Sequence, residues 1–413
     1  MQMAVSPLKS KNVVLVTSTN LACNPRCLKE LKLLVKLDAV VTVVAFNLNN
    51  WTNVQEEKIR NEFTQVNFIY LKATKKDNLL SWLIASCTQK LSNFFLFFLP
   101  KNIFLNAMAS SKINWMLFRF FRNTSIDANL VIAHNPGAFY AAAFFAKKKN
   151  ARLAIDVEDF HPGETNGTSD LSNKVSAVMA NILPKCTYTS YASPLIKEHT
   201  QQLVKINLQN AIVINNSFSQ EEFNLPQQHN TSNVVKMVWF SQYIDYGRGL
   251  EILLPILDIF SKNISITLIG NCRQIFYDNE IANRKYITSI ASMPHQGLQL
   301  ELSKYDIGLA FEDASTNFNR NICLTNKIWS YFQAGLFILA TNTDAQKVFI
   351  HQHSNHGLTT STNTHDLEKN ISFLINEINQ IKSKKSLRFS QAQKFSWENE
   401  SLQLIKMWEK VLG

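Results

Sequence analysis

The sequence predicts an α/β protein made of two doubly wound domains. Short apolar runs rich in β-branched residues alternate with helical patterns along the 413 residues. Buried strands that are separated by helices are typical of a parallel sheet with both faces covered. The chain is much longer than one average domain of roughly 150 residues, and its 46% hydrophobic content is enough for a core in each half. We therefore expect two such domains, one after the other.

The first domain is expected to span residues 1–204. A helix begins at Asn24-Pro25, because Asn is a favourable N-cap and Pro fits the first helical position. A second helix follows Pro136, and its apolar residues continue to the lysines at 147–149. The predicted strands lie at 13–18, 39–46, 130–134 and 152–157.

Residues 78–123 interrupt this alternation. The segment mixes aromatic and aliphatic residues with Lys and Arg, which predicts amphipathic helices inserted into the first domain. Its longest apolar run, 93–108, is broken by Pro100 and Lys101. It falls short of the roughly 20 residues that span a bilayer. Two interpretations stay open: a helical cap packed on the sheet, or a patch that contacts a membrane surface.

The second domain is expected to span residues 205–394, starting with a strand at 211. A Gln- and Asn-rich stretch at 220–233 is predicted to be a loop, and an amphipathic helix at 395–413 closes the chain. The further strands are predicted at 236–241, 264–270, 306–311 and 336–341, and the helices at 249–260, 297–305 and 325–335.

Residues that follow the strands of the first domain are candidates for chemistry, because ligands of parallel sheets lie beyond the carboxyl ends of the strands. His134 ends one strand next to a helix start, where it could donate to a substrate oxygen or simply be satisfied by backbone. The next strand runs into an acidic loop, 156–164, with Asp156 and Glu158. This loop could supply a general base or only order the site. The cluster could also bind a metal, although its spacing matches no hydrolytic zinc motif.

The second domain offers two places for an anion. Arg248-Gly249 opens a helix, and arginine pairs bidentately with phosphate oxygens near the positive helix end. Thr325 or Asn326 caps a second helix, with Lys327 in its first turn. A lysine there opposes the helix dipole unless an anion such as a diphosphate binds beside it. The alternative is a solvated lysine.

The amino-acid composition limits the kinds of partner that the protein is expected to bind. The net charge of +11 favours anionic ligands or membrane surfaces, but no nucleic-acid module or basic helix accompanies it, so no nucleic acid is expected. The six cysteines form no CxxC pair, and the first residues lack a secretory pattern, so a cytoplasmic location is expected. The histidine run at 351–356 matches no metal-ligand spacing, and we interpret it as a solvated loop.

Several motifs in order resemble family 4 of the retaining glycosyltransferases. They are NPRCLKELKLL at 24, LVIAHNPGAFYAAA at 130, AIDVEDFHPGE at 154, WFSQYIDYGRGLEILLPIL at 239 and LTNKIWSYFQAGLFILAT at 324. The resemblance implies the GT-B fold: two Rossmann-like domains facing a cleft, with a C-terminal helix that crosses back to the first domain. It also implies retaining transfer of a sugar from a nucleotide-diphosphate sugar, with no metal and no other cofactor.

The resemblance also implies roles for single residues. Arg248 would replace the family's diphosphate-binding lysine next to Gly249, and His134 would contact the donor sugar. Lys327, Asn326 and Thr325 would lie beside the donor.

Three positions depart from the family pattern. Gln242 stands where the family has an arginine, and Ser330 stands where a glutamate grips the nucleotide ribose. The first glutamate of that pair falls at Ile322. Glu312 or Asp313 could supply the missing acid.

We expect a hexosyltransferase that acts on a glycan or lipid-linked acceptor in surface polysaccharide synthesis, in the cytoplasm at the inner face of the membrane. In that case residues 78–123 would provide peripheral membrane contact. The alternative is a catalytically impaired protein of the same fold that binds a sugar nucleotide or a partner enzyme, which the missing glutamates favour. A sugar-nucleotide epimerase is a further alternative, but the NPR motif at 24 and the closing helix at 395–413 resemble the transferases more.

Overall fold

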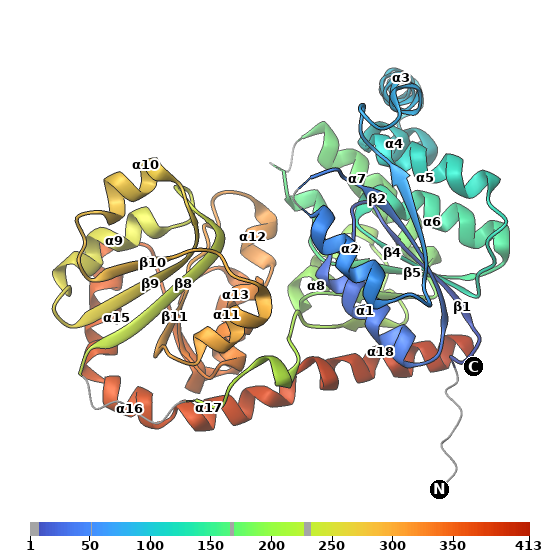
Figure 1. Ribbon diagram of the computed structural model, residues 1–413. Helices are drawn as coiled ribbons and strands as arrows, with labels where there is room; N and C mark the ends of the chain where they lie inside the picture. The colour runs from blue at the N-terminus through green and yellow to red at the C-terminus, as the bar shows by residue number, and fades with distance from the viewer. Residues whose placement is uncertain (1–7, 51, 166–168, 227–232) are drawn as a thin grey trace, which may run out of the picture. The chain divides into compact units, whose positions relative to one another are not determined.

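The computed structural model describes residues 8–50, 52–165, 169–226 and 233–413 (Figure 1). In this part of the chain the strands form two parallel sheets, one of seven strands and one of six. The chain divides into two compact units, Met1–Ile214 with Ser401–Gly413, and Asn215–Glu400. The predicted α/β class with two parallel sheets is therefore confirmed.

The sheet of the first unit has the order β3-β2-β1-β4-β5-β6-β7, and all its pairs are parallel. The order reverses between β1 and β4, as in doubly wound folds, where this switch point is the usual ligand position. The strands are β1 (Asn12–Thr17), β2 (Val40–Asn47), β3 (Asn67–Lys72), β4 (Leu130–His134), β5 (Arg152–Val157), β6 (Tyr188–Tyr191) and β7 (Ala211–Val213).

The helices of the first unit form more than one layer. α6 packs on β1, β4 and β5, α5 packs on α6, and α3 contacts α4 and α5, so it lies further out (Figure 1). The helices are α1 (Pro25–Lys36), α2 (Asn53–Glu62), α3 (Leu79–Leu96), α4 (Ile103–Ser110), α5 (Lys112–Asn123), α6 (Pro136–Lys149), α7 (Asp170–Ile182) and α8 (Pro194–Val204). The helical prediction for 78–123 is thus correct.

The sheet of the second unit repeats the doubly wound pattern in the order β10-β9-β8-β11-β12-β13. One face of the sheet carries an apolar core cluster that includes Trp239, Leu254, Leu309 and Leu339, and Val238 and Ile338 on the other face are buried too. The strands are β8 (Val235–Ile244), β9 (Ile264–Cys272), β10 (Ile287–Ile290), β11 (Ile307–Ala310), β12 (Phe337–Thr341) and β13 (Gly357–Thr360).

The helices of the second unit include the two whose first turns were predicted to bind an anion, α9 and α13. They are α9 (Leu250–Ile259), α10 (Gln274–Phe276), α11 (His295–Leu302), α12 (Phe318–Ile322), α13 (Asn326–Gln333), α14 (Asp344–Gln352), α15 (Thr364–Asn376), α16 (Ile378–Ser383) and α17 (Lys385–Ala392). The closing helix α18 (Trp397–Leu412) begins in the second unit and ends in the first. In the first unit the indole N–H of Trp408 donates to the Tyr188 hydroxyl over 2.7 Å.

Three expectations need correction. The strand at 211, assigned to the start of the second domain, is β7 and pairs with β6 in the first sheet. The histidine run is no solvated loop, because His356 is buried against Phe332 and its Nε2 lies 3.2 Å from the Arg388 carbonyl. The loop predicted at 220–233 includes a short helical turn, Gln220–Glu222, and its residues 227–232 lie outside the described part. Residues 1–7, at the predicted non-secretory start, lie outside it too.

Candidate functional site

The carboxyl edge of the second sheet gathers most of the predicted anion-binding residues. The loop after β8 ends at Gly249, the N-cap of α9, where φ is 82°. This conformation suits glycine, and a side chain here would contact Phe311 at the end of β11. The backbone N–H of Gly247 donates to Glu251 over 2.7 Å and fixes the loop. The first turn of α9 is therefore held beside β11.

Arg248 is a free cation at this edge. Its side chain is partly exposed, and among the described residues it has no hydrogen-bond or ion-pair partner. A guanidinium carries five N–H donors in a planar fork that matches two oxygens of a phosphate group. Arg248 also directly precedes the N-terminus of a ten-residue helix, α9. Its charge and the helix dipole therefore add up in favour of an anion at this point.

Lys327 lies near the same edge but is not free. Its Nζ is 3.0 Å from Glu312 Oε1, and both side chains are about nine-tenths buried. The ammonium also lies 4.9 Å from the centre of the Trp239 ring, which is an attractive cation–π arrangement. The sequence analysis considered a solvated lysine or an anion-binding lysine, and the structure places instead an ion pair with the ammonium over an aromatic ring.

Glu312 is the acid that organises this edge. Its Oε1 accepts from the Thr325 hydroxyl over 3.2 Å as well as from Lys327. Its backbone N–H donates to Thr341 on the neighbouring strand β12. No partner of Oε2 is found among the described residues. Glu312 thus joins β11, β12 and the start of α13, and keeps one oxygen available.

The remaining predicted residues of this unit surround or lie outside that group. Asn326 is exposed at the first position of α13, and Gln242 is exposed on β8. Asp313 accepts from the N–H and hydroxyl of Ser315, and these bonds lower the pKa of its carboxyl. Ser330 is only 1% exposed and accepts a 2.8 Å hydrogen bond from Gln299. Its hydroxyl is therefore committed to the protein interior, away from the surface where a nucleotide would bind.

At the corresponding edge of the first sheet, a buried ion-pair network replaces free cations. Arg26 binds both oxygens of Asp156, with its Nε and Nη2 at 2.7 and 2.6 Å. The Ser190 hydroxyl donates to Asp156 over 2.6 Å, and Arg26 also donates to the Ile214 carbonyl. Asp156 is completely buried, and the arginine lowers the pKa of its carboxyl despite the cost of burial. The pair links α1, β5, β6 and the end of the first unit.

His134 belongs to this network. Its Nδ1 is 3.1 Å from Glu158 and its Nε2 is 3.5 Å from Glu30. Burial by itself would lower the pKa of His134, but the neighbouring Cys27 and Glu30 raise it well above the ordinary value. The side chain has no exposed surface. Direct contact with a donor sugar, as the family resemblance implied, would require the acids around the imidazole to move.

Arg26 and Glu30 were not recognised as site residues from the sequence. A signal was nevertheless present, because positions 26, 27, 30, 31 and 34 form the buried face of α1. Arginine and glutamate on an apolar helix face are rarely buried without partners. The pattern could have indicated a buried pair, although not its partners, which come from distant strands.

His134, Asp156 and Glu158 bring three potential metal ligands within 4.8 Å of one another. The donor set does not suit a cation, since both Asp156 oxygens are bound to the Arg26 guanidinium, whose charge would repel the ion. The Glu158 carboxylate accepts in addition from Asn24, over 2.6 Å. The cluster is therefore explained by ion pairs between protein side chains.

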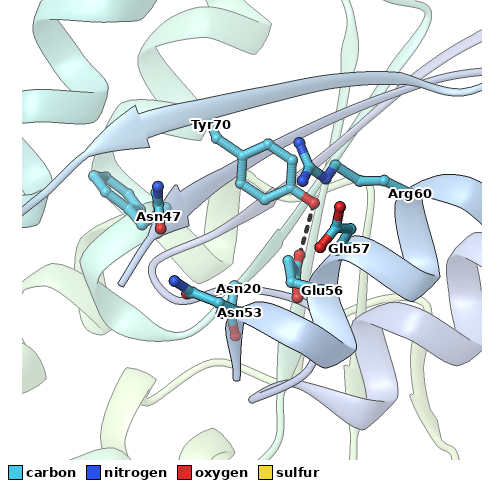
Figure 2. Close-up of a pocket in the computed structure, with 8 residues that line it drawn as sticks. Asn20, Asn47, Asn53, Glu56, Glu57, Arg60 and Tyr70 are labelled. Carbon is cyan, nitrogen blue, oxygen red and sulfur yellow. Dashed lines mark hydrogen bonds between the residues drawn. The ribbon is translucent and has the colours of Figure 1, made fainter. Parts of the chain in front are cut away.

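A separate polar pocket of about 260 Å³ lies beside β3 and α2 in the first unit (Figure 2). Its deepest acid, Glu56, accepts from Tyr70 over 2.7 Å and from the N–H groups of Leu21 and Ala22. Figure 2 shows Glu57 and Arg60 on the α2 side of the hollow. The lining residues are Asn20, Phe46, Asn47, Asn53, Glu56, Glu57, Arg60 and Tyr70. This pocket could not be found from the sequence, because its residues come from four separate segments.

Comparisons with known proteins place the fold but not the family. No family model and no curated protein matches the chain. A glycosyltransferase from Rickettsia africae aligns with 98% of this chain and 99% of its own at TM-score 0.64 and 14% identity. Anabaena HepE in complex with UDP aligns with 97% of this chain and 100% of its own at TM-score 0.64 and 13% identity.

Sucrose-phosphate synthase from Thermosynechococcus elongatus also aligns, with 97% of this chain and 98% of its own, at TM-score 0.65 and 11% identity. The predicted GT-B class is thus confirmed at the level of the fold. The resemblance to family 4 stays a prediction.

Proposed function

We propose that the protein is a glycosyltransferase that moves a sugar from a nucleotide-diphosphate sugar to a glycan or lipid-linked acceptor. The observation that carries this proposal is the free guanidinium of Arg248 at the start of α9, on the carboxyl edge of the second sheet. The chain shares its fold with glycosyltransferases, and HepE has been solved with UDP. This combination supports a diphosphate at the edge formed by β8 and β11.

In the proposed mechanism, protein cations stabilise the leaving diphosphate. Arg248 donates in bidentate fashion to phosphate oxygens, and the first N–H groups of α9 point at the same anion. Lys327, at the start of α13, would add less than Arg248, because Glu312 offsets its charge. These groups would favour the transition state, because negative charge builds up on the diphosphate as the bond to the sugar breaks. We propose that the reaction needs no metal ion and no other cofactor.

We propose Glu312 as the acid that holds the nucleotide ribose. Its Oε1 is occupied by Lys327 and Thr325, whereas Oε2 can accept from a ribose hydroxyl. Glu312 would thereby replace the glutamate that the family carries at the position of the buried Ser330. Asp313 and Asn326 would lie at the border of the donor site, and Gln242 would contribute only a neutral contact.

The acceptor is proposed to bind the first unit. The pocket in Figure 2 offers carboxylate, amide and guanidinium groups, which suit the hydroxyls of a sugar ring. Glu57→Ala should weaken acceptor use and leave donor binding unchanged, as kinetics at varied acceptor concentration would test. An unchanged KM for the acceptor would remove the pocket from the reaction.

His134 is proposed to act as a positioning residue, which holds Glu158 in place through its protonated ring.

Retention of the anomeric configuration and a role in surface polysaccharide synthesis are further proposals that rest on the motif resemblance. The second candidate function is a protein of this fold that binds a sugar nucleotide without turning it over. The buried Ser330 favours it, because the family's ribose-binding acid has no direct replacement there.

Calorimetric titration with UDP and GDP, followed by assays of donor hydrolysis with their sugars, separates these candidates. We expect a nucleoside diphosphate to bind, and a matching sugar donor to be slowly hydrolysed. Binding without hydrolysis or transfer would support the second candidate. If the wild type binds neither UDP nor GDP, both candidates are overturned. We expect Lys262→Ala, a change at the opposite edge of the second sheet, to bind like the wild type.

A further inference from the structure

α3 buries small residues, whereas a helix of a globular protein normally buries its large apolar residues. Its buried residues are the small Ala85 and Ser92, one on each side of the Gln89 side chain, which donates to the Ala109 carbonyl on α4. Large apolar residues normally face the core, and a helix with a polar outer face is the rule. In α3 most large apolar residues face solvent instead, and Trp82, Ile84 and Leu96 are only partly buried, so the helix presents an apolar stripe outward.

The outward stripe is continuous along the helix. Leu80, Leu83, Leu91 and Phe94 follow one another at spacings that place them on one face, and Phe98 extends the row just past the helix end. Each is between 44% and 69% exposed. Beyond the helix end, Phe97 is 84% exposed and Leu99 is 53% exposed. Phe94, Phe97 and Phe98 contact each other edge to face, so they form one aromatic surface. We call residues 79–99 the α3 surface.

α5 shows that this exposure is not a general property of the inserted segment. α5 buries Met116, Leu117 and Phe121, and Phe121 stacks on Phe145 of α6 at 4.4 Å. α4 is likewise buried at Ala107 and Met108. The packed cap and the exposed patch are therefore both present in residues 78–123, and they belong to different helices. Within residues 78–123, the exposed large apolar side chains all belong to the α3 surface.

The basic residues of this segment favour a partner with anionic groups. Residues 78–123 contain five basic residues and no acid. Lys90 and Lys101 are exposed on the helix and just after it. Exposed apolar side chains that are framed by cations suit the boundary between acyl chains and anionic headgroups. The helix cannot cross a bilayer, since no described helix is long and apolar enough to do so.

We propose that the α3 surface docks the first unit on an anionic lipid bilayer, with its aromatic end inserted among the acyl chains. Phe94, Phe97 and Phe98 enter the apolar layer, and Lys90 and Lys101 remain at the level of the headgroups. The inference rests on the first unit alone and does not depend on the proposed sugar transfer. It commits the partner to a lipid surface, although a second copy of the chain could also cover an apolar face.

Vesicle co-sedimentation of the full chain tests the proposal. We expect binding to vesicles of phosphatidylcholine mixed with phosphatidylglycerol, and far weaker binding to phosphatidylcholine alone. Replacement of Phe94, Phe97 and Phe98 by Glu should reduce binding at least ~10-fold, because it removes apolar insertion and adds repulsion. Lys90→Gln with Lys101→Gln should reduce it about 5-fold for each charge. Absence of vesicle binding by the wild type at low salt would overturn the proposal.

A matched control keeps the test specific. Ile259, Ile275 and Phe373 of the second unit are also exposed, by 63%, 71% and 46%. Their replacement by Glu adds the same charge, and vesicle binding should stay close to that of the wild type. Equal losses in both triple variants would overturn the proposal. The proposal would also be overturned if light scattering showed that the wild type is a dimer and the α3 variant a monomer, and if lipid had no effect on either. Nucleoside diphosphate binding by the α3 variant should be unchanged, which separates this inference from the proposed function.

Discussion

The carboxyl edges of the two sheets carry charges in opposite ways. In the first unit, Arg26 and His134 are buried and face Asp156, Glu158 and Glu30 at close range. In the second unit, Arg248 stands without a partner among the described residues, and the nearby ion pairs are Lys327 with Glu312 and Arg273 with Asp245. The two sheets share one strand order, so the difference lies in the side chains and not in the topology.

The two edges therefore have different roles: the charges of the first edge stabilise the fold, and those of the second edge are available to bind a ligand. A buried charge is tolerated when an opposite charge and hydrogen bonds compensate its lost hydration. The network around Asp156 meets that condition and needs no ligand. Arg248 stays hydrated and uncompensated, which leaves its full charge for an anion. Substitutions at the first edge should therefore affect folding, and substitutions at the second edge should affect chemistry.

The largest effect is expected from Asp156→Ala. It leaves the Arg26 guanidinium buried without its counter-ion, and removal of one partner of a buried pair costs about 3–5 kcal/mol. Urea denaturation should show this loss relative to the wild type. Asp258→Ala is the control, since its pair with Arg284 is 44% exposed on the aspartate side and should cost about 1 kcal/mol or less. If Asp156→Ala does not fold, Asp156→Asn should give a smaller loss in the same direction. Equal losses at both sites would contradict the comparison.

Arg248→Ala should lower kcat/KM strongly and leave stability almost unchanged. Loss of a charge-assisted hydrogen bond of about 1.5–3 kcal/mol corresponds to a decrease of roughly 10- to 100-fold. The side chain has no partner in the described chain, so the free energy of unfolding should change by less than about 0.5 kcal/mol. Steady-state kinetics and urea denaturation on the same preparation would check both. A variant with wild-type kinetics would show that Arg248 lies outside the site.

The central strands could be predicted from the sequence, whereas the edge strands β3 and β13 could not. The edge strand β7 was predicted but assigned to the wrong domain. β1, β2 and β4 are buried on both faces and are continuous apolar runs, which is the signal expected of a parallel sheet. β3 and β13 lie at sheet edges, are only partly buried and are therefore less apolar. β6 was not predicted, because its sequence YTSY is polar. It is nevertheless buried, since Ser190 donates to Asp156 and the Tyr188 hydroxyl accepts from Trp408.

The candidate site followed the same division. Arg248, Lys327 and Glu312 were expected at the donor edge because each lies just after a strand or at a helix start. The pairing of Lys327 with Glu312 was not predictable, since the two meet only through the packing of α13 on β11. Burial was equally hidden: neither His134 nor Ser330 shows in the sequence that its side chain faces inward. Periodicity gives positions along an element, but not the elements that cover it.

A pH-dependent difference is expected from His134. Its raised pKa means that the charged imidazole is stabilised in the folded state by Glu30, Asp156 and Glu158. This contribution is complete below the unfolded value of about 6.5 and is lost as pH rises through the folded value, by at most about 1.4 kcal/mol per pH unit. Urea denaturation of wild type and His134→Gln from about pH 6 upward should therefore show a shrinking difference.

The comparison with His134→Gln is necessary because Glu30, which also has a raised pKa, would destabilise both proteins in the same direction as pH increases. Arg26 is present and charged in both proteins and cancels. Glu30, Cys27 and Tyr188 lose the lowering effect of the imidazole in His134→Gln, so their pKa values rise further in the variant. A difference that is constant with pH would show that the imidazole is neutral in the folded state.

The smallest effect is expected from Ser330→Ala, and its type is as informative as its size. The substitution removes the hydroxyl that accepts from Gln299 in the interior, which should cost about 1 kcal/mol of stability. Nucleoside diphosphate affinity should change less than about 2-fold, because a side chain that is 1% exposed cannot touch a ribose. Urea denaturation and calorimetric titration measure the two quantities. A loss of affinity without a loss of stability would reverse the assignment, and would place Ser330 rather than Glu312 against the nucleotide.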